Sequence, residues 1–578
     1  MEGNTMNNIG SFSILYPDCN NIRCTRLTQT ACHDIGLDSV CNKITEDVKE
    51  QHLIMNVLSE MTSDTDTMVY RRDVFADLLR LPQLRKRLTE LFDKVEFIRE
   101  YGIMHIESDD KLGLWHLMHR LEELNDYIKC VEEMKECLEG ADITSAGLIA
   151  FREHIDELYN DACFAEMKKD IAALKVETSD VRSVTIGINV NERFEAVSMG
   201  LISINDKPFK KSNIFSNFAD AVSPKDKIHN GTDWNGDMHY HVVEQRKDAS
   251  YFAFLEKAAS VWADSKSPMD FNTKSTLVAV PEGNGVFNLT FHIENMVNKM
   301  LDILVRKLRD TLTKYASVAV MDISRLIPEF VYYIRMAEFI EGCMEKGFPF
   351  CEAQVSDNSS CSMSVNGFYN LKLAMNISDK NDIVYNDLVF DEKHTIYILT
   401  GANRGGKTTA TQAIGLLFVL AQGGIYVPAA EFFYRPVDCI YTHFPADEDK
   451  TMDLGRLGEE CIRFKEIYNS CTAESLLLMN ETFSTTSFEE GYYIARDAVR
   501  ALVKKQVRTI YNTHMHKLAA DAEELSKASD NAGVASLIVK SEDGKRSFKI
   551  EAAAPEGLSY AMDIAEKYGV TYDMLVGE

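Results

Sequence analysis

The chain has 578 residues, of which 45% are hydrophobic and 26% charged, and a formal net charge of −27. This composition is ordinary for a soluble protein with room for three or more domains. The negative net charge means that the surface as a whole repels nucleic acid. Any DNA contact therefore needs local basic patches or a ring of protein around the duplex. The N-terminus lacks a basic segment followed by an apolar stretch, and no run approaches about 18 uninterrupted apolar residues, so we expect a cytoplasmic protein without a membrane span.

The first 35 residues form an N-terminal segment, which holds the first of the cysteines that are spread over the chain. The 13 cysteines of the chain include no Cys-x-x-Cys pair, which favours reduced thiols over a disulfide framework. Zinc-ligand types do cluster near this end, but their spacing matches no ligand pattern, so we expect no metal there. The residues concerned are Cys19, Cys24, Cys32, His33 and Cys41.

Helical periodicity dominates residues 36–182. Apolar residues recur near helical spacing, for example at Phe75, Leu78 and Leu79, and prolines are few. Such runs are typical of helices that bury one face in a core. We therefore expect the first half of a long helical shaft.

A β-rich insertion is predicted for residues 183–290. Val184–Val190 and Ala196–Ile204 have β character on either side of a turn, and a polar, irregular stretch follows them. Helical periodicity returns from Phe291 to Glu345, within a returning half of the shaft that is predicted for residues 291–368. The layout is thus one shaft that leaves as a helix, carries a β insertion and returns as a helix.

The last part, residues 369–578, contains a phosphate-loop pattern. The apolar run Ile396–Leu399 is followed by Thr-Gly-Ala-Asn-Arg-Gly-Gly-Lys-Thr-Thr and then by a predicted helix from Thr409 to Leu420. Small residues let successive backbone N–H groups wrap a polyphosphate, and the helix start favours the anion. The alternative is a chance glycine turn. The expected nucleotide contacts are Gly401, Ala402, Asn403, Arg404, Gly405, Gly406, Lys407, Thr408 and Thr409.

Two later strands end in polar residues. Ser475–Glu481 is an apolar run that places Asn480 where phosphate-loop ATPases carry an acidic Mg²⁺ ligand, and Glu481 where several families carry the residue that activates water. The run Thr509–Thr513 is followed by His514, which can sense the γ-phosphate or orient water. The alternatives are a core strand with ordinary polar ends and a histidine with a local hydrogen-bonding role.

The order and spacing of these motifs resemble the MutS family of DNA mismatch-repair ATPases. The resemblance runs from Asn386-Asp-Leu388 to Gly569, and through the helix, insertion, helix layout it extends over most of the chain. Besides the phosphate loop, it rests on Ala421–Pro428, Val437–Ile440, Leu476–Glu481, Thr486-Ser487, Asn512-Thr-His514 and Gly557–Tyr560.

The resemblance implies an α/β P-loop ATPase domain preceded by a long α-helical lever domain with a small β-rich clamp insertion. Its members form dimers with composite ATP sites and enclose DNA with the clamp. ATP and Mg²⁺ are the implied cofactors, and DNA and a second copy the implied partners. By position, Lys407 binds phosphate, Thr408 and Asn480 hold Mg²⁺, Glu481 is the general base, Asn403 and His514 sense the γ-phosphate or water, and Asn386 joins the nucleotide site.

The sequence also departs from the family pattern. The family's mismatch-reading domain precedes the lever helices, but here the helical pattern begins by about Val40, so we expect that domain to be lacking. Gly455 stands near the position of the family's trans-acting serine, and Ile383 near that of an aromatic for adenine stacking. An amide at Asn480 is a neutral ligand, which weakens Mg²⁺ binding. We expect ATP binding with slow hydrolysis.

Three functions are compatible with the sequence. The first is a MutS-like DNA-binding ATPase, of mismatch repair or of DNA-structure recognition, that recognises a junction or branched duplex or clamps duplex DNA without reading mismatches. The second is a nucleotide-switched protein-interaction module that does not bind DNA, which the net charge of −27 supports. The third, a metabolic P-loop kinase, has no acceptor site in its favour. Lys207, Lys210 and Lys211 lie in the predicted clamp, where they either meet phosphates or form a solvated loop.

Overall fold

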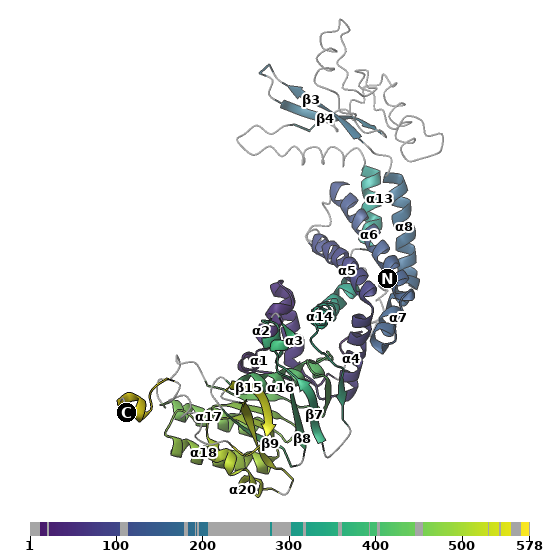
Figure 1. The fold of residues 1–578 in the computed structure, drawn as a ribbon. Helices are drawn as coiled ribbons and strands as arrows, with labels where there is room; N and C mark the ends of the chain where they lie inside the picture. Colours follow the sequence, from purple (N-terminus) through teal and green to yellow (C-terminus); the bar gives the residue numbers. More distant parts are fainter. Residues whose placement is uncertain are drawn as a thin grey trace, which may run out of the picture. The chain divides into compact units, whose positions relative to one another are not determined.

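The computed structural model describes most of the chain (Figure 1). Its contacts form two compact units, a larger one of residues 1–89, 140–153 and 325–578, and a smaller one of residues 90–139 and 154–324. The domain boundaries expected from the sequence stay predictions. The described residues are 12–19, 22–103, 114–178, 183–190, 192–193, 196–205, 278–279, 302–315, 320–356, 361–377, 379–391, 393–401, 405–445, 455–529, 531–542, 545–555 and 568–576.

A six-stranded sheet forms the centre of the larger unit, in the order β11-β12-β13-β9-β14-β15. The first five strands are parallel, and β15 runs antiparallel to β14. Every residue of β9 and β13 is buried, as expected for parallel strands covered on both faces. The strands are β9 (Ile396–Thr400), β11 (Ile440–His443), β12 (Leu476–Asn480), β13 (Arg508–Asn512), β14 (Val534–Glu542) and β15 (Lys545–Ala552).

Helices cover both faces of this sheet. Successive residues of β12 point to opposite faces, and each of the two residues below packs against a different helix. Leu477 joins the core formed with α18 (Phe488–Lys505). Leu478 points the other way, towards α16 (Lys407–Gln422), where a Cβ added to Gly415 would lie 3.0 Å from it. Gly415 therefore allows the close approach of helix and strand. The remaining helices of this part are α17 (Gly455–Ser470), α19 (His516–Ala520), α20 (Ala522–Ser526) and α22 (Tyr572–Val576).

A second, four-stranded sheet of the larger unit has the order β6-β10-β7-β8. Strands β6 and β10 are parallel, and the other pairs are antiparallel. The strands are β6 (Ala353–Val355), β7 (Cys361–Phe368), β8 (Asn386–Asp391) and β10 (Glu431–Tyr434), with α15 (Leu371–Ala374) and the 3₁₀ turn η2 (Lys380–Asp382) between β7 and β8. Strand β8 of this sheet directly precedes β9 of the six-stranded sheet in the sequence.

Helices from the start of the chain pack onto α16. Both α3 and α4 contact it, and α1 contacts β11. These elements are β1 (Thr25–Arg26), α1 (Gln29–Asp34), α2 (Leu37–Ile44), α3 (Val48–Ser59), β2 (Glu60–Met61) and α4 (Thr65–Arg80). Residues far apart in the sequence thus share one core with the phosphate-loop helix.

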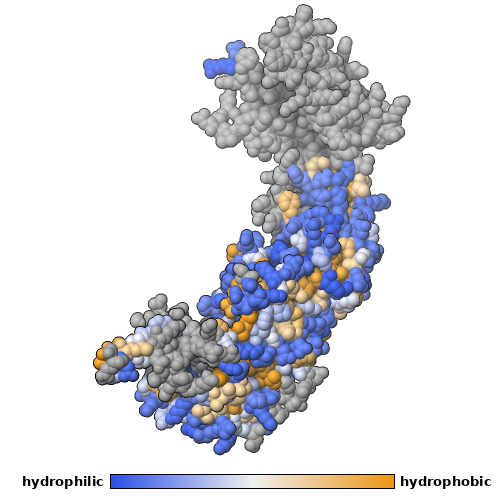
Figure 2. All heavy atoms as spheres, in the orientation of Figure 1, coloured by the Kyte–Doolittle hydropathy of each residue, from blue (hydrophilic) through white to orange (hydrophobic). Residues whose placement is uncertain are grey.

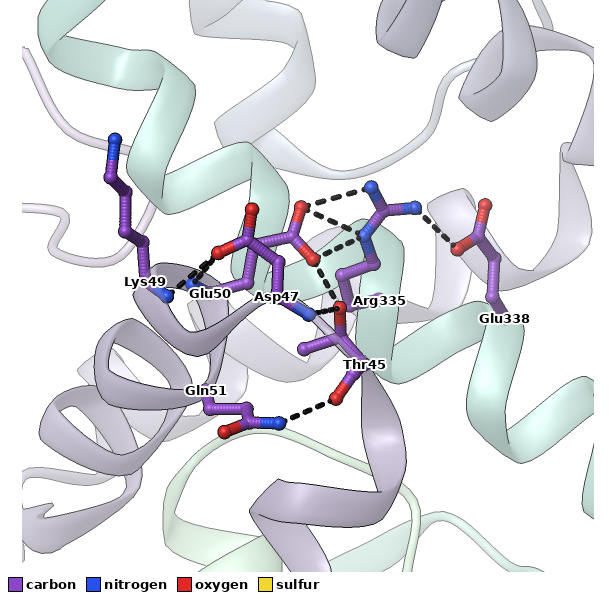
Figure 3. A network of polar contacts seen from close by, with 7 residues as sticks. All are labelled: Thr45, Asp47, Lys49, Glu50, Gln51, Arg335 and Glu338. Carbon is purple, nitrogen blue, oxygen red and sulfur yellow. Dashed lines mark hydrogen bonds and ion pairs between the residues drawn. The ribbon is translucent and has the colours of Figure 1, made fainter.

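A polar network ties α3 to α14 (Val320–Glu345) within the larger unit (Figure 3). The Arg335 guanidinium donates to both carboxylate oxygens of Glu50, at 2.9–3.0 Å, and to Glu338 at 3.0 Å. The Thr45 hydroxyl donates to Glu50, and Asp47 caps α3 by accepting from two backbone N–H groups. Because such a bidentate pair fixes geometry as well as charge, it sets where the return helix lies against α3.

The smaller unit combines long helices with a β-hairpin. Helix α6 (Leu114–Glu139) packs against α8 (Ala162–Thr178) and α13 (Asp302–Thr313). Both predicted strands of the insertion are present as an antiparallel pair, β3 (Ser183–Val190) and β4 (Ala196–Asn205), joined by β5 (Val278–Ala279). Helices α5 (Pro82–Ile103), α7 (Ala146–Asn160) and α14 (Val320–Glu345) continue from one unit into the other.

Two properties of the described residues concern apolar character, namely the length and hydropathy of the helices and the exposure of apolar side chains at the surface. Among the described helices, none combines the length and the apolar character that crossing a bilayer requires. The segment from Tyr568 to Val576, which includes α22, exposes several large apolar side chains, and Figure 2 shows hydrophobic surface over it at the lower left. Tyr572 and Leu575, for example, are 74% and 68% exposed.

Candidate nucleotide-binding site

The carboxyl ends of the central strands meet at one edge of the six-stranded sheet. Asn480 of β12 lies opposite Asn512 of β13, and Asn512 lies opposite Leu399 of β9. Ligands of open α/β sheets bind beyond this edge. The register therefore brings the phosphate-loop pattern and the ends of the two later strands together.

The chain turns sharply between β9 and α16. Gly401 and Gly406 have φ of 136° and 93°, in the region that favours glycine. Helix α16 begins at Lys407, two residues before the predicted start, because Gly406 in the left-handed conformation directs the chain into it. Ala402, Asn403 and Arg404 lie outside the described residues, so their predicted roles stay predictions.

A cavity of about 680 Å³ opens at this turn. Its volume lies within the range of small-molecule sites. Nine residues of the predicted site line it, together with aromatic and apolar residues that the sequence argument did not select. The lining residues are Phe368, Tyr369, Asn370, Leu373, Ile377, Asp382, Ile383, Val384, Asn386, Gly405, Gly406, Lys407, Thr408, Thr409, Ala410, Ala413, Asn480, Glu481, His514 and Phe548.

Lys407 lies at the turn itself. Its side chain is 6% exposed, and the ammonium donates to the Gly401 carbonyl over 2.8 Å. Burial lowers the pKa of Lys407, while the nearby Glu481 carboxylate raises it. A buried ammonium group that donates to a backbone carbonyl at the wall of the cavity is suited to an anionic ligand.

Three neutral side chains form a triangle at the predicted metal position. The Thr408 hydroxyl donates to Asn480 Oδ1 at 3.1 Å, and Asn512 Nδ2 donates to Asn480 Oδ1 at 2.5 Å and to Thr408 Oγ1 at 3.2 Å. The two predicted ligands, Thr408 and Asn480, are therefore adjacent. Both present oxygen, which Mg²⁺ prefers, so the donor set fits this ion. No group of three or more His, Cys, Asp or Glu residues in the described part of the chain has metal-binding geometry.

Glu481 and His514 form a pair at the cavity wall. His514 Nε2 lies 3.0 Å from Glu481 Oε1. Burial raises the pKa of Glu481, although Lys407 lowers it, and burial together with Lys407 lowers the pKa of His514. A neutral imidazole with its proton on Nε2 donates to the carboxylate. A carboxylate with a raised pKa is a stronger proton acceptor, as a general base requires.

Helix α17 holds the turn that follows Glu481. Glu481 and Phe483 have φ of 49° and 62°, a strained pair of conformations for residues with side chains. The Glu460 carboxylate accepts from the Phe483 backbone N–H at 2.8 Å, and Tyr511 donates to the Thr482 carbonyl at 2.6 Å. These contacts fix the backbone that positions Glu481.

His443 joins the same turn from β11. Its Nε2 donates to the Glu460 carbonyl at 3.1 Å, and its Nδ1 lies 3.0 Å from the Thr482 hydroxyl and 3.5 Å from Arg463. Burial, reinforced by the Arg463 charge, lowers the pKa of His443 from 6.5 to about 4. The imidazole is therefore neutral at pH 7, and a second ring proton would face the guanidinium.

The far end of the cavity is apolar and aromatic. Ile383 lines it beside Tyr369, and Phe548 is 44% exposed with φ of 55°. The Phe548 ring lies 3.3 Å from where a Cβ on Gly406 would be. Asn386 lines the cavity too, but its amide holds β15, accepting from Ile550 N–H at 2.8 Å. Sequence reasoning missed Phe548, and an aromatic residue within an alternating strand gave no signal for it.

Two models of known protein families match the sequence. The pattern of MutS domain V matches residues 397–576, and that of the MutS2 N-terminal domain matches residues 63–342. "Endonuclease MutS2" of Thermus thermophilus is 28% identical over 194 residues, which are 34% of this chain and 25% of the relative. "DNA mismatch repair protein MutS" of Chlorobium chlorochromatii is 33% identical over 191 residues, 33% of this chain and 22% of the relative.

A longer alignment exists with "Endonuclease MutS2" of Finegoldia magna, which is 24% identical over 322 residues, 53% of this chain and 39% of the relative. The chain thus aligns with less than two fifths of the length of each of these relatives. The two matched patterns between them cover most of the chain.

Proposed function

Because the chain belongs to the MutS family, we propose that it binds ATP with Mg²⁺ in the cavity at the carboxyl edge of the six-stranded sheet and hydrolyses it slowly. The observation that carries this proposal is the convergence of five side chains from three strand ends on one cavity of nucleotide size. They are Lys407, Thr408, Asn480, Glu481 and His514.

Each side chain has a role that its surroundings support. Lys407 binds the β- and γ-phosphates, and Thr408 and Asn480 hold Mg²⁺, which would supply charge neutralisation at the phosphates. Glu481 takes a proton from the attacking water, and His514 orients that water through its hydrogen bond to Glu481. Since Asn480 brings no negative charge, the metal is held less strongly than by a carboxylate. Slow turnover follows.

We propose that the protein binds DNA, either in mismatch repair or in the recognition of a branched DNA structure. Relatives named DNA mismatch repair proteins support this step. The predicted clamp, residues 183–290, lies largely outside the described residues, including Lys207, Lys210 and Lys211. With a net charge of −27, the contact must be local. The same charge favours the alternative, a nucleotide-switched module that binds another protein.

A second copy of the chain is the proposed partner. The described segment Tyr568–Val576 exposes apolar side chains over a short stretch, and such patches mark contact surfaces. Pairing would allow composite ATP sites. This part of the proposal is tested by the mass of the protein in solution with and without ATP.

Binding of labelled DNA tests the function as a whole. Homoduplex, mismatched duplex and four-way-junction DNA are compared with and without ATP across a salt series, with Lys407→Ala as the matched variant. We expect preference for one structure, a response to ATP that Lys407→Ala loses, and affinity that falls with salt because counterions are released. ATP binding without binding to any DNA would instead favour the protein-interaction module.

A further inference from the structure

Asn480 differs from an aspartate in a way that matters for a metal site. A carboxylate presents two equivalent oxygens, whereas an amide has one oxygen and one NH₂ group that cannot bind a cation. A half-turn of the Asn480 side chain would replace the oxygen by NH₂ at nearly unchanged shape. An asparagine at this position therefore needs a partner that decides which end faces the metal.

Asn512 is placed to make that decision. It lies directly opposite Asn480 in the neighbouring strand, is 1% exposed, and donates through Nδ2 to Asn480 Oδ1 at 2.5 Å and to Thr408 Oγ1 at 3.2 Å. If the Asn480 amide turned over while Asn512 kept its orientation, two NH₂ groups would meet in a buried space. The contact thus favours the oxygen-forward orientation of Asn480.

Rotation of one hydroxyl can free a lone pair of Asn480 Oδ1 for the cation. A carbonyl oxygen accepts two hydrogen bonds, and those of Asn480 Oδ1 come from Asn512 and from the Thr408 hydroxyl. The hydroxyl proton can rotate away, whereas the Asn512 amide is enclosed. Asn512 Oδ1 is itself buried without a hydrogen-bond partner among the described residues, so the hydrogen bonds of the Asn512 side chain are made by its NH₂ group.

We propose that Asn512 is a positioning residue for the metal site: its NH₂ group locks the Asn480 amide with the oxygen towards the Mg²⁺ of bound ATP. Asn512 does not line the cavity and acts through Asn480. The inference rests on the proposed function, since it concerns the metal that accompanies the nucleotide. It also predicts that Asn512 becomes dispensable once residue 480 has two equivalent oxygens.

A double-variant cycle tests this directly. The affinity for a fluorescent ATP analogue is measured with EDTA and with saturating Mg²⁺, and the ratio of the two dissociation constants is called the metal coupling. It is compared in the native chain, Asn512→Ala, Asn480→Asp and the double variant. Asn512→Val, which suits a strand and also lacks the donor, provides a second variant should the alanine protein fail to fold. Thr509→Val, on the same buried strand, is the matched control.

We expect Asn512→Ala and Asn512→Val to lower the metal coupling about tenfold, as loss of a metal ligand's supporting hydrogen bond does, with affinity in EDTA unchanged. In the Asn480→Asp background the same change should alter the coupling by less than about twofold. Equal losses in both backgrounds would mean a general structural role and overturn the proposal, as would an unchanged coupling in the native background. Absence of any ATP binding by the native chain would instead contradict the proposed function itself.

Discussion

Acidification provides a sharp test of the buried network behind the candidate site. His443 is 1% exposed, its pKa is lowered from 6.5 to about 4, and its Nδ1 faces Arg463. The native state therefore keeps the imidazole neutral, while the unfolded chain takes up a proton below pH 6.5. Stability contributed by the neutral histidine is present above pH 6.5 and is lost as the pH falls towards 4.

The size of the loss follows from the two pKa values. Between pH 6.5 and 4 each pH unit lowers the free energy of unfolding by about 1.4 kcal/mol for one such group. At pH 5 the loss relative to pH 7 is thus about 2 kcal/mol. Burial raises the pKa of Glu460 and of Glu481, and those carboxyls change stability in the opposite direction. The comparison must therefore isolate the histidine.

Urea unfolding of the native chain and of His443→Gln across this pH range isolates it. Circular dichroism is the suitable signal, because all three tryptophans belong to the smaller unit. We expect the native chain to lose about 2 kcal/mol more than His443→Gln between pH 7 and pH 5. The exposed His52→Gln on α3 is the matched control, since it leaves the buried network intact. Parallel pH curves for the native chain and His443→Gln would refute the reasoning.

Three further predictions concern hydrolysis and packing. Asn480→Asp should raise ATP turnover several-fold at limiting Mg²⁺ by restoring a charged ligand, and an unchanged turnover at every Mg²⁺ concentration would refute this. Glu460→Ala should lower kcat about tenfold at similar KM, because the Phe483 N–H loses the acceptor that holds the turn after Glu481. Glu460→Gln keeps an acceptor and should retain most of the activity. Equal losses of activity in both variants would indicate that Glu460 acts through packing. Arg335→Ala should destabilise the larger unit by about 1–3 kcal/mol, measured by urea unfolding, because Glu50 loses its bidentate partner; an unchanged midpoint would contradict it.

The local pattern of the sequence predicted the elements around the site well. Strands are indicated by the apolar runs that begin at Ile396 and Leu476, and the turn is indicated by Gly401 and Gly406. These signals depend on residues that are close together in the sequence. The start of α16 was predicted two residues late, since residue propensity does not reveal how Gly406 directs the chain. Family resemblance supplied the rest of the site.

Contacts between distant residues could not be predicted in this way. Helical periodicity shows that a face is buried, but not against which element, so nothing in the sequence indicates that Gln412 of α16 donates to the Asp34 carbonyl at 2.7 Å. Arg71 is fully buried, donates to the Leu15 carbonyl and lies over the Tyr16 ring. The role of Asn512 likewise depends on strand register, which pairs it with a residue 32 positions away.

The central claim is that the cavity at the sheet edge binds and hydrolyses ATP through Lys407 and Glu481. Single-turnover hydrolysis, measured beside equilibrium ATP binding for the native chain, Lys407→Ala and Glu481→Gln, tests it most directly. We predict that the native chain and Glu481→Gln bind ATP equally, that only the native chain hydrolyses it, and that Lys407→Ala binds weakly. Hydrolysis by Glu481→Gln at the native rate, or ATP binding unaffected by Lys407→Ala, would contradict the account.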